Sequence, residues 1–433
     1  MNTIEYSKTI PIKYMPDVAV IGGGIAGTVA ACAAAKEGLS VLLVEHFGVL
    51  GGQGTVGGVR GFDGTNSGQG AVFDEIHADL ERFNAIDKPL VARKGAIGGG
   101  KYDHEILAVV LQELVQRHQV KLLLHTDFID ATTENGHIEW AILHGKSGLC
   151  GVKAKYYIDA SGEADLVHAA GFETMKGRPE DGLQLPMSLN FFVRSNALRG
   201  VQYPIPHDYF AWTPYNHHSD LPMTSIRHVG RSGKTLKVKI PCFDATDTES
   251  LTAAEIEARR KMMQVLQYYQ AKGHKNWDLD YCSPKIGVRE GRRVVGEYIL
   301  TVEDLRAGRE FPDAIAVGHY PLDAHKPDDD KRTYILPKNQ LAVPPYHIPL
   351  RSLIPRHSTN LLVAGRNLSA DQLAMSSARV MTTCAFMGQA AGIVLAHCCQ
   401  NHCTPLEVVA KSMPTIQSRL KENRCELNLT YYR

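Results

Sequence analysis

Short apolar runs flank a helix-like segment near the start of the chain. Residues 18–21 and 41–44 are continuously apolar, which is typical of strands buried on both faces of a parallel sheet. The segment between them, from about Ile25 to Glu37, is rich in alanine and favours a helix. The pattern therefore predicts a parallel β–α–β unit over the first 45 residues.

The next part of the chain alternates between helical and strand patterns. Apolar residues recur at helical spacing over residues 102–118, which predicts a helix with one buried face. Three strands are predicted at residues 121–130, 138–144 and 151–159, and the Asn135-Gly136 pair between the first two favours a tight hairpin turn. We interpret these strands as a β-meander inserted into the α/β domain.

The middle of the chain has a different composition, with Tyr, Trp, His and Pro residues and runs of alternating apolar and polar residues such as "LKVKIP". One long helix is predicted from Thr252 to Gly273, with Thr252 and Glu255 as its capping box. The last ninety residues return to a strand, a turn and an apolar helix. The predicted fold class is α/β. Residues 1–176 and 342–433 are predicted to form a Rossmann-like dinucleotide-binding domain with an inserted β-meander, and residues 177–341 to form a second, α+β substrate domain.

A glycine-rich turn follows the first strand. Gly22, Gly24 and Gly27 match GxGxxG directly before the helix, and Glu45 ends the second strand, where a carboxylate can accept hydrogen bonds from ribose hydroxyls. The alternative is a purely structural glycine turn followed by a chance acid. Strand, glycines, helix and acid together favour a dinucleotide site.

Three later segments favour a resident flavin over a nicotinamide. They are "GGQGT" at residues 51–55, "DASGEAD" at 159–165, and "AGRN" at 364–367, which precedes a helix whose N-terminus can face the flavin. No second GxGxxG unit follows a strand, and we interpret Gly98–Gly100 as a loop. The electron partner is therefore left open among dioxygen, a quinone, another protein and a second substrate.

Together with three further segments, these motifs resemble the FAD-dependent oxidoreductase family of glutathione-reductase-type flavoproteins over about residues 17–400. The further segments are "IGVREGRRVVGEY", "HIPLRSLIPRHSTNLLVAGRNLSA" and "SARVMTTCAFMGQAAG". The resemblance implies bound FAD. It implies adenosine contacts at Gly22, Gly24, Gly27 and Glu45, flavin contacts at Gly51, Gly52 and Thr55, adenine contacts at Phe128, Ala160, Ser161 and Gly162, and pyrophosphate or ribitol contacts at Gly365 and Arg366. Further candidate cofactor contacts are Ile25, Ala26, His46, Gln53, Met387 and Gly388.

The candidate catalytic residues come from three segments. "GHYPLDAHKP" brings Asp323 and His325 together, and a histidine suits proton transfer near neutral pH; the alternative is a solvated loop. Arg289 can clamp a substrate carboxylate or pair with nearby glutamates. Arg379, close to the flavin-facing helix, can bind substrate or stabilise reduced flavin.

Composition narrows the functional classes. The 433 residues carry a net charge of +1, which gives little support to nucleic acid or an anionic membrane as a partner. The nine cysteines lack CxxC spacing, so we expect neither a metal site nor a disulfide framework. The N-terminal residues lack a signal pattern, and the apolar run around Gln389 favours a buried helix over a membrane span.

We therefore expect a cytoplasmic FAD-dependent oxidoreductase that transfers a hydride between a small polar metabolite and FAD, with its oligomeric state left open. Two alternatives are a non-redox flavoenzyme, such as an isomerase or synthase, and a tRNA-modifying flavoprotein.

Overall fold

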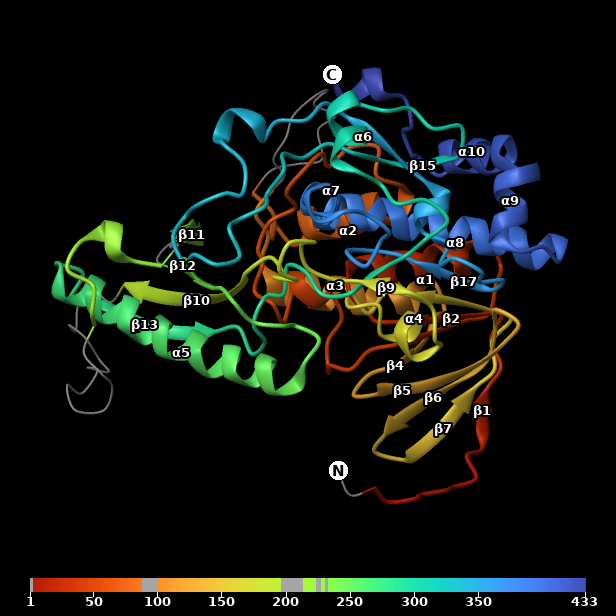
Figure 1. The fold of residues 1–433 in the computed structure, drawn as a ribbon, viewed down its shortest axis with the longest axis horizontal. Helices are drawn as coiled ribbons and strands as arrows, with labels where there is room; N and C mark the ends of the chain where they lie inside the picture. The colour runs from red at the N-terminus through yellow and green to blue at the C-terminus, as the bar shows by residue number, and fades with distance from the viewer. Residues whose placement is uncertain (1–2, 88–99, 196–212, 223–226, 230–232) are drawn as a thin grey trace.

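A parallel sheet forms the centre of the protein (Figure 1). The computed structural model describes residues 3–87, 100–195, 213–222, 227–229 and 233–433; Gly98 and Gly99 of the predicted loop lie outside these ranges. The sheet has the strand order β17-β8-β2-β3-β4. Its strands are β2 (Val18–Ile21), β3 (Val41–Val44), β4 (Lys121–Leu123), β8 (Tyr156–Asp159) and β17 (Leu361–Val363). The two strands predicted at the N-terminus are confirmed with the same bounds and are fully buried.

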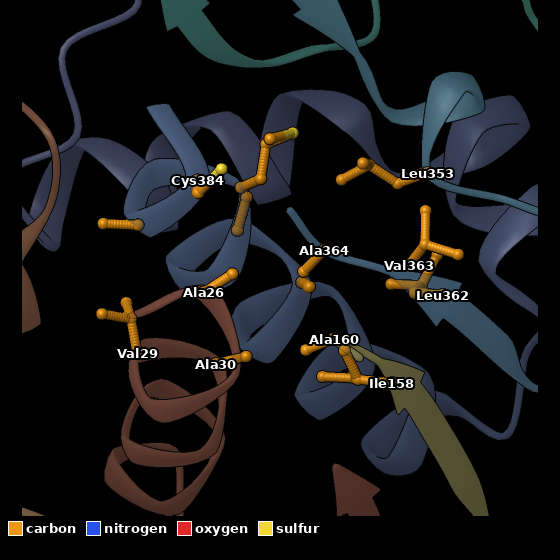
Figure 2. Close-up of a cluster of buried hydrophobic side chains, with 14 of the residues drawn as sticks. Ala26, Val29, Ala30, Ile158, Ala160, Leu353, Leu362, Val363, Ala364 and Cys384 are labelled. Carbon is orange, nitrogen blue, oxygen red and sulfur yellow. The ribbon is translucent and has the colours of Figure 1, made fainter. Parts of the chain in front are cut away.

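The C-terminal part of the chain completes this sheet. Strand β17 pairs in parallel with β8, so that Leu361 lies opposite Tyr157 and Val363 opposite Asp159. Helix α1 (Ile25–Lys36) packs against α8 (Met381–Asn401) on one side of the sheet, as Figure 2 shows for Ala26, Ala30 and Cys384. The apolar run of α8 is long enough to span a membrane, but 94% of it is buried, so the predicted buried helix is confirmed.

Small residues allow α1 and α8 to approach closely. A Cβ atom on Gly388 would lie 2.3 Å from the Ala26 carbonyl oxygen, and one on Gly392 would lie 2.7 Å from that of Ala30. Met387 is fully buried in the same core. These contacts explain why the α8 segment is rich in glycine and alanine.

The meander is a separate four-stranded sheet of order β1-β7-β6-β5. Its strands are β1 (Ile12–Tyr14), β5 (Asp127–Glu134), β6 (His137–Gly145) and β7 (Gly148–Val152). The predicted hairpin turn is confirmed, with φ of 49° at Asn135 and 77° at Gly136. Two predicted strands were wrong in extent, because residues 121–130 and 151–159 each divide between the meander and the parallel sheet.

A second lobe carries its own core, at the left of Figure 1. Strands β11 (Arg227–Val229), β12 (Gly233–Ile240), β10 (Met187–Ser195) and β13 (Trp277–Cys282) form an antiparallel sheet covered by α5 (Thr248–Ala271). We call this lobe the cap. The predicted capping box at Thr252 was wrong, because α5 begins one turn earlier and the Asp247 side chain accepts a hydrogen bond from the Ser250 amide.

The remaining elements surround the large core. The helices are α2 (Ala71–Arg82), α3 (His104–Arg117), α4 (Asp165–Ala169), α6 (Val302–Ala307), α7 (Gln372–Ala378), α9 (Pro405–Lys411) and α10 (Met413–Glu422). The strands are β9 (Thr174–Met175) with β14 (Arg293–Val294), and β15 (Ala314–Gly318) with β16 (Tyr346–Pro349). The domain limits at 176 and 341 stay predictions; the buried side chains of β14, α6 and β15 pack in the large core.

Candidate functional site

A cavity of about 500 Å³, here called the strand-end cavity, opens where β2, β3 and β8 end. Loops after the carboxyl ends of parallel strands are the usual ligand sites of such sheets. Its lining from the larger body includes Gly22, Glu45, Phe128, Ala160 and Arg366. The predicted dinucleotide motifs therefore meet at one place.

The first glycine turn approaches its neighbours too closely for a side chain. Gly22 has a φ of 101°, and a Cβ atom there would lie 2.4 Å from the Ala160 carbonyl oxygen. Nothing lies within 4 Å of a Cβ position on Gly24, which faces the cavity. Gly27 does not line the cavity; a Cβ atom there would lie 1.9 Å from the Gly22 carbonyl oxygen, so its role is close packing.

Glu45 fastens this turn to the end of β3. Its carboxylate accepts hydrogen bonds from the Gly23 amide at 2.7 Å and the Phe47 amide at 2.8 Å. Burial raises the pKa of Glu45, and these two bonds oppose the shift. Each carboxylate oxygen keeps a further lone pair for a ribose hydroxyl.

The "GGQGT" turn lies directly against the first glycine turn. The Gly51 amide donates to the Gly23 carbonyl at 2.8 Å, and φ is 107° at Gly51 and 54° at Gly52. Thr55 is buried, and its hydroxyl donates to the Leu50 carbonyl at 2.7 Å, so it holds the turn without lining the cavity. The two turns form one continuous backbone surface.

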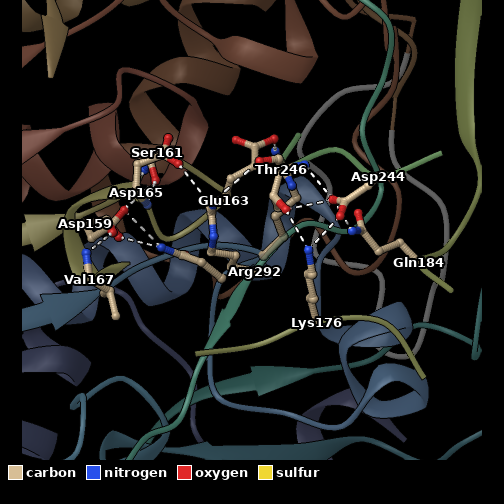
Figure 3. Close-up of polar contacts among 12 residues, drawn as sticks. Asp159, Ser161, Glu163, Asp165, Val167, Lys176, Gln184, Asp244, Thr246 and Arg292 are labelled. Atoms are coloured by element: carbon tan, nitrogen blue, oxygen red, sulfur yellow. Dashed lines mark hydrogen bonds and ion pairs between the residues drawn. The ribbon is translucent and has the colours of Figure 1, made fainter. Parts of the chain in front are cut away.

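A fully buried carboxylate organises the third turn (Figure 3). Asp159 accepts from the Ser161 amide at 3.0 Å, the Ser161 hydroxyl at 2.7 Å and the Asn367 side-chain amide at 3.1 Å. It thereby ties the "DASGEAD" turn to the "AGRN" turn. Burial raises the pKa of Asp159 in spite of these hydrogen bonds.

Two ion pairs border the same part of the cavity. Arg366 pairs with Glu163. Arg292 lies 3.4 Å from Asp165, and Figure 3 shows both residues. Burial opposes ionisation of Glu163, but the charge of Arg366 outweighs it and lowers the pKa. Among the described residues, the buried Nη1 of Arg366 and Oδ1 of Asn367 have no hydrogen-bond partner. Such orphaned polar atoms fit a polar ligand.

The cap supplies one wall that sequence reasoning missed. Lys285, Thr246 and the first residues of α5 line the strand-end cavity. Asp244 fixes this segment by accepting hydrogen bonds from Lys176 at 2.6 Å and from the Thr246 amide at 2.8 Å (Figure 3). No sequence motif marks these positions, because they reach the cavity only through the placement of the cap.

The structure brings most of the predicted cofactor residues to this cavity. Those that line it are Gly22, Gly24, Ile25, Ala26, Glu45, His46, Gly51, Gly52, Gln53, Phe128, Ala160, Ser161, Gly162, Gly365 and Arg366. Met387 and Gly388 do not line it: they lie in the core around α1 and α8, three and four residues beyond the lining residue Cys384. Their placement corrects the expectation that they contact the cofactor.

The sequence of the whole site region matches one family model. Residues 17–420 match the model described as FAD dependent oxidoreductase. The chain belongs to the FAD-dependent oxidoreductase family. FAD is accordingly the cofactor, and the glycine turns, Glu45 and Arg366 fit a ligand with ribose and pyrophosphate groups.

Solved structures show the same fold at low sequence identity. A geranylgeranyl bacteriochlorophyll reductase-like protein from Thermoplasma acidophilum aligns with a TM-score of 0.50 and 14% identity, covering 94% of this chain and 84% of its own. A triple mutant of the flavin-dependent brominase Bmp2 gives 0.50 and 13% over the same shares. BexE gives 0.50 and 12%, over 94% of this chain and 68% of its own. No protein of curated function matches significantly.

A second cavity of about 490 Å³, here called the cap cavity, adjoins the FAD site. It lies between the cap strands β10 and β12 and the larger body, and is lined by Ser188, Asn190, Arg289, Tyr320 and Asp323 among others. The two cavities share five lining residues: Gln53, Val288, Arg366, Arg379 and Met381. The FAD site is therefore continuous with a second space of substrate size.

The helix that faces this junction differs from the predicted one. The helix directly after "AGRN" is α7, which lines neither cavity. Met381 and Cys384, in the first turn of α8, line the strand-end cavity, and that turn contains no acidic residue. The positive end of the α8 dipole is thus directed at the junction.

Asp323 connects two of the other candidate catalytic residues. It accepts a hydrogen bond from Arg379 at 2.9 Å and lies 3.2 Å from Nε2 of His325. Burial raises the pKa of Asp323, but the bond to His325 and the charges of Arg379 and Arg289 hold it well below its usual value. Asp323 and Arg379 line the cap cavity, whereas His325 is buried behind Asp323 and lines neither cavity.

The three arginines of the "GVREGRR" segment, Arg289, Arg292 and Arg293, lie in different places. Arg293 is buried, pairs with Glu290 and donates to the Gly177 carbonyl at 3.0 Å. Arg292 lines the strand-end cavity and Arg289 the cap cavity. Arg289 donates from Nη1 to the Pro186 carbonyl at 2.6 Å and to the Ser188 hydroxyl.

Proposed function

We propose that this FAD-dependent enzyme transfers a hydride between FAD and a small polar metabolite bound in the cap cavity. One observation carries the proposal: the cap cavity and the strand-end cavity share Gln53, Val288, Arg366, Arg379 and Met381. A substrate in one cavity would therefore contact a ligand in the other. Bound FAD supplies the hydride acceptor or donor.

The residues of the chain bind and orient the substrate. Arg379 is fixed by the Asp323 carboxylate, so its guanidinium keeps one orientation at the junction. His325 acts as a positioning residue, since it holds Asp323 from behind and lies outside the described lining of both cavities.

For a substrate O–H or N–H group, Asp323 is the proposed hydrogen-bond acceptor. It lines the cap cavity, and its carboxylate is ionised because its pKa is lowered by His325, Arg379 and Arg289 against the effect of burial. When the substrate C–H bond breaks and its electron pair leaves as hydride, the heteroatom releases its proton to water, and Asp323 orients the O–H or N–H group by accepting a hydrogen bond from it. In the opposite direction, hydride transfer from reduced FAD would reduce the substrate.

The finer family grouping also belongs to this proposal. The parallel sheet with an inserted meander and the "DASGEAD" turn support a glutathione-reductase-type FAD domain. The GxGxxG unit after a strand occurs once in the sequence, which supports dioxygen, a quinone, another protein or a second substrate as the electron partner.

An anaerobic screen of fractionated metabolites against the FAD-loaded protein tests the proposal. We expect at least one fraction to bleach the flavin absorbance, or to reoxidise flavin reduced beforehand. A protein that holds FAD but exchanges no electrons with any fraction would favour the non-redox alternative. Salt-sensitive binding to tRNA would favour the tRNA-modifying alternative, for which a net charge of +1 gives little support.

A further inference from the structure

The cap cavity has an unusual excess of fixed positive charge. Arginine and lysine side chains among its described lining outnumber aspartates by six to four, and it has no glutamate. Two of these cations are already neutralised: Arg379 pairs with Asp323, and Arg366 pairs with Glu163.

The aspartates of the cavity are largely occupied elsewhere. Asp103 caps α3 by accepting from the Glu105 amide at 2.9 Å and the Ile106 amide at 3.2 Å. Asp87 accepts from the Lys101 amide at 2.7 Å. Asp323 is shared by Arg379 and His325.

Two arginines of this cavity form no ion pair with any described residue. Arg289 is 8% exposed, and both of its hydrogen bonds come from Nη1 and go to neutral acceptors, the Pro186 carbonyl and the Ser188 hydroxyl. Arg60 stacks on Phe192 with its guanidinium carbon 3.9 Å from the ring centre, and its buried Nε has no hydrogen-bond partner among the described residues. Arg289 is buried near one carboxylate, that of Asp323, which Arg379 shares, and Arg60 is half-buried. This surplus of positive charge favours an anionic ligand in the cavity.

Electrostatics support this assignment. Burial, followed by repulsion from Arg379, lowers the pKa of Arg289 to about 10, and burial lowers the pKa of Arg60. Both groups remain charged at neutral pH. An anion in the cavity would relieve both effects, and a guanidinium offers a planar fork of donors that matches a carboxylate.

We propose that the cap cavity binds a small carboxylic acid as substrate, whose negative charge is balanced by Arg289, beside Ser188, and by Arg60, beside Phe192. This inference rests on the proposed function, because it takes the cap cavity as the substrate site. A carboxylate is favoured over a phosphate because the hydrogen bonds of Arg289 go to neutral acceptors and its planar guanidinium matches a planar monoanion.

Matched pairs of acids and amides provide the test. The FAD-loaded protein is titrated with succinate, succinamide, benzoate and benzamide, and binding is followed by the flavin difference spectrum and the thermal midpoint. We expect each acid to bind at least about tenfold more tightly than its amide, since each pair has nearly the same shape and differs in charge. Equal affinity within both pairs, or no binding of either acid at about 10 mM, would overturn the proposal.

Substitutions then assign the effect to the two arginines. Arg289→Met and Arg60→Met should each remove most of the acid preference, and Arg289→Lys should restore part of it. Arg306→Met, on the surface of α6, is the matched control and should retain the preference. Flavin content is measured for every variant. Acid preference that persists in both Arg→Met variants would contradict the assignment.

The outcomes separate this inference from the proposed function. A protein that holds FAD and is reduced by a metabolite but shows no acid preference retains the proposed function and loses the carboxylate site. A protein that binds the acids but exchanges no electrons with any metabolite fraction loses the proposed function instead.

Discussion

His325 illustrates how a buried side chain can act on a site that it does not line. Its two ring nitrogens lie near acceptors, 3.2 Å from the Asp323 carboxylate and 3.1 Å from the Thr333 carbonyl, and the ring stacks on Tyr334 at 4.5 Å. Burial lowers the pKa of His325, although the bond to Asp323 opposes this shift. The neutral ring therefore has one hydrogen to donate and two acceptors to satisfy.

Removing this ring should disturb Asp323 and, through it, Arg379. We expect His325→Ala to slow flavin reduction by about tenfold or more, because small displacements of positioning groups cost that much, while bound FAD is retained. Stopped-flow reduction and flavin content measure the two effects, with His218→Ala as an exposed control. Reduction at the wild-type rate would remove His325 from the account.

Asp165 provides a pH-dependent test of the strand-end cavity. Partial desolvation, together with the charges of Glu163 and Asp159, raises the pKa of Asp165 to about 7, although 49% of its side chain is exposed. Since this value lies above that of an unfolded aspartate, the folded protein binds the proton more tightly. This residue therefore lowers the free energy of unfolding as pH rises from about 4 to 7, and solvent screening keeps the change small because the side chain is 49% exposed.

The same charge should repel the phosphates of FAD once it forms. We expect the dissociation constant of FAD to increase several-fold between pH 6 and pH 8, and Asp165→Asn to suppress that increase. Fluorescence titration of the apoprotein measures it, with exposed Asp130→Asn as the control. An identical pH profile for wild type and Asp165→Asn would show that Asp165 does not face the phosphates.

Residue identities were predictable where one local motif sets the geometry. Gly22, Gly24 and Glu45 follow from a strand, a turn and a second strand that are adjacent in sequence. Lys285 and Arg60 were not predictable, because they reach the two cavities from segments far apart in the chain. His325 was predictable as a partner of Asp323, but its burial behind that residue was not.

At the scale of elements, α1 and α8 pack closely because small residues line their interface. A methyl group on Gly388 would lie 2.3 Å from the Ala26 carbonyl oxygen, which belongs to a helix backbone and cannot move freely. Because overpacking of this kind typically costs about 1–3 kcal/mol, we expect Gly388→Ala to lower the free energy of unfolding by that amount.

Urea unfolding followed by circular dichroism measures the change. Gly145→Ala is the control, because a Cβ atom there would meet Thr126 at an ordinary 3.4 Å, and a change within about 0.5 kcal/mol is expected. Equal stability of the two variants would contradict the close packing of α1 on α8.

Element boundaries were harder to predict than element types. Residues 121–130 were predicted as one strand, but φ is +50° at His125 and the chain leaves the parallel sheet there to enter the meander. Residues 151–159 are likewise divided between β7 and β8. Apolar periodicity identifies a strand, but it carries no information on which of two sheets the strand joins.

At the scale of the whole molecule, the account depends on two cavities that meet. The strand-end cavity is built from motifs near residues 22, 51, 160 and 365, and the cap closes it with Lys285 and the start of α5. The cap cavity requires the cap strands and the larger body together. Neither cavity is formed by one part of the sequence alone, which explains why the family motifs indicate FAD but do not identify the substrate.

The most direct test of this account is a crystal structure of the protein with FAD bound. We predict that the flavin ring contacts Arg366, Arg379 and Met381 where the two cavities meet, with one face toward the cap cavity and the adenosine near Glu45. A flavin ring that lies outside this junction, with no access to the cap cavity, would contradict the central claim.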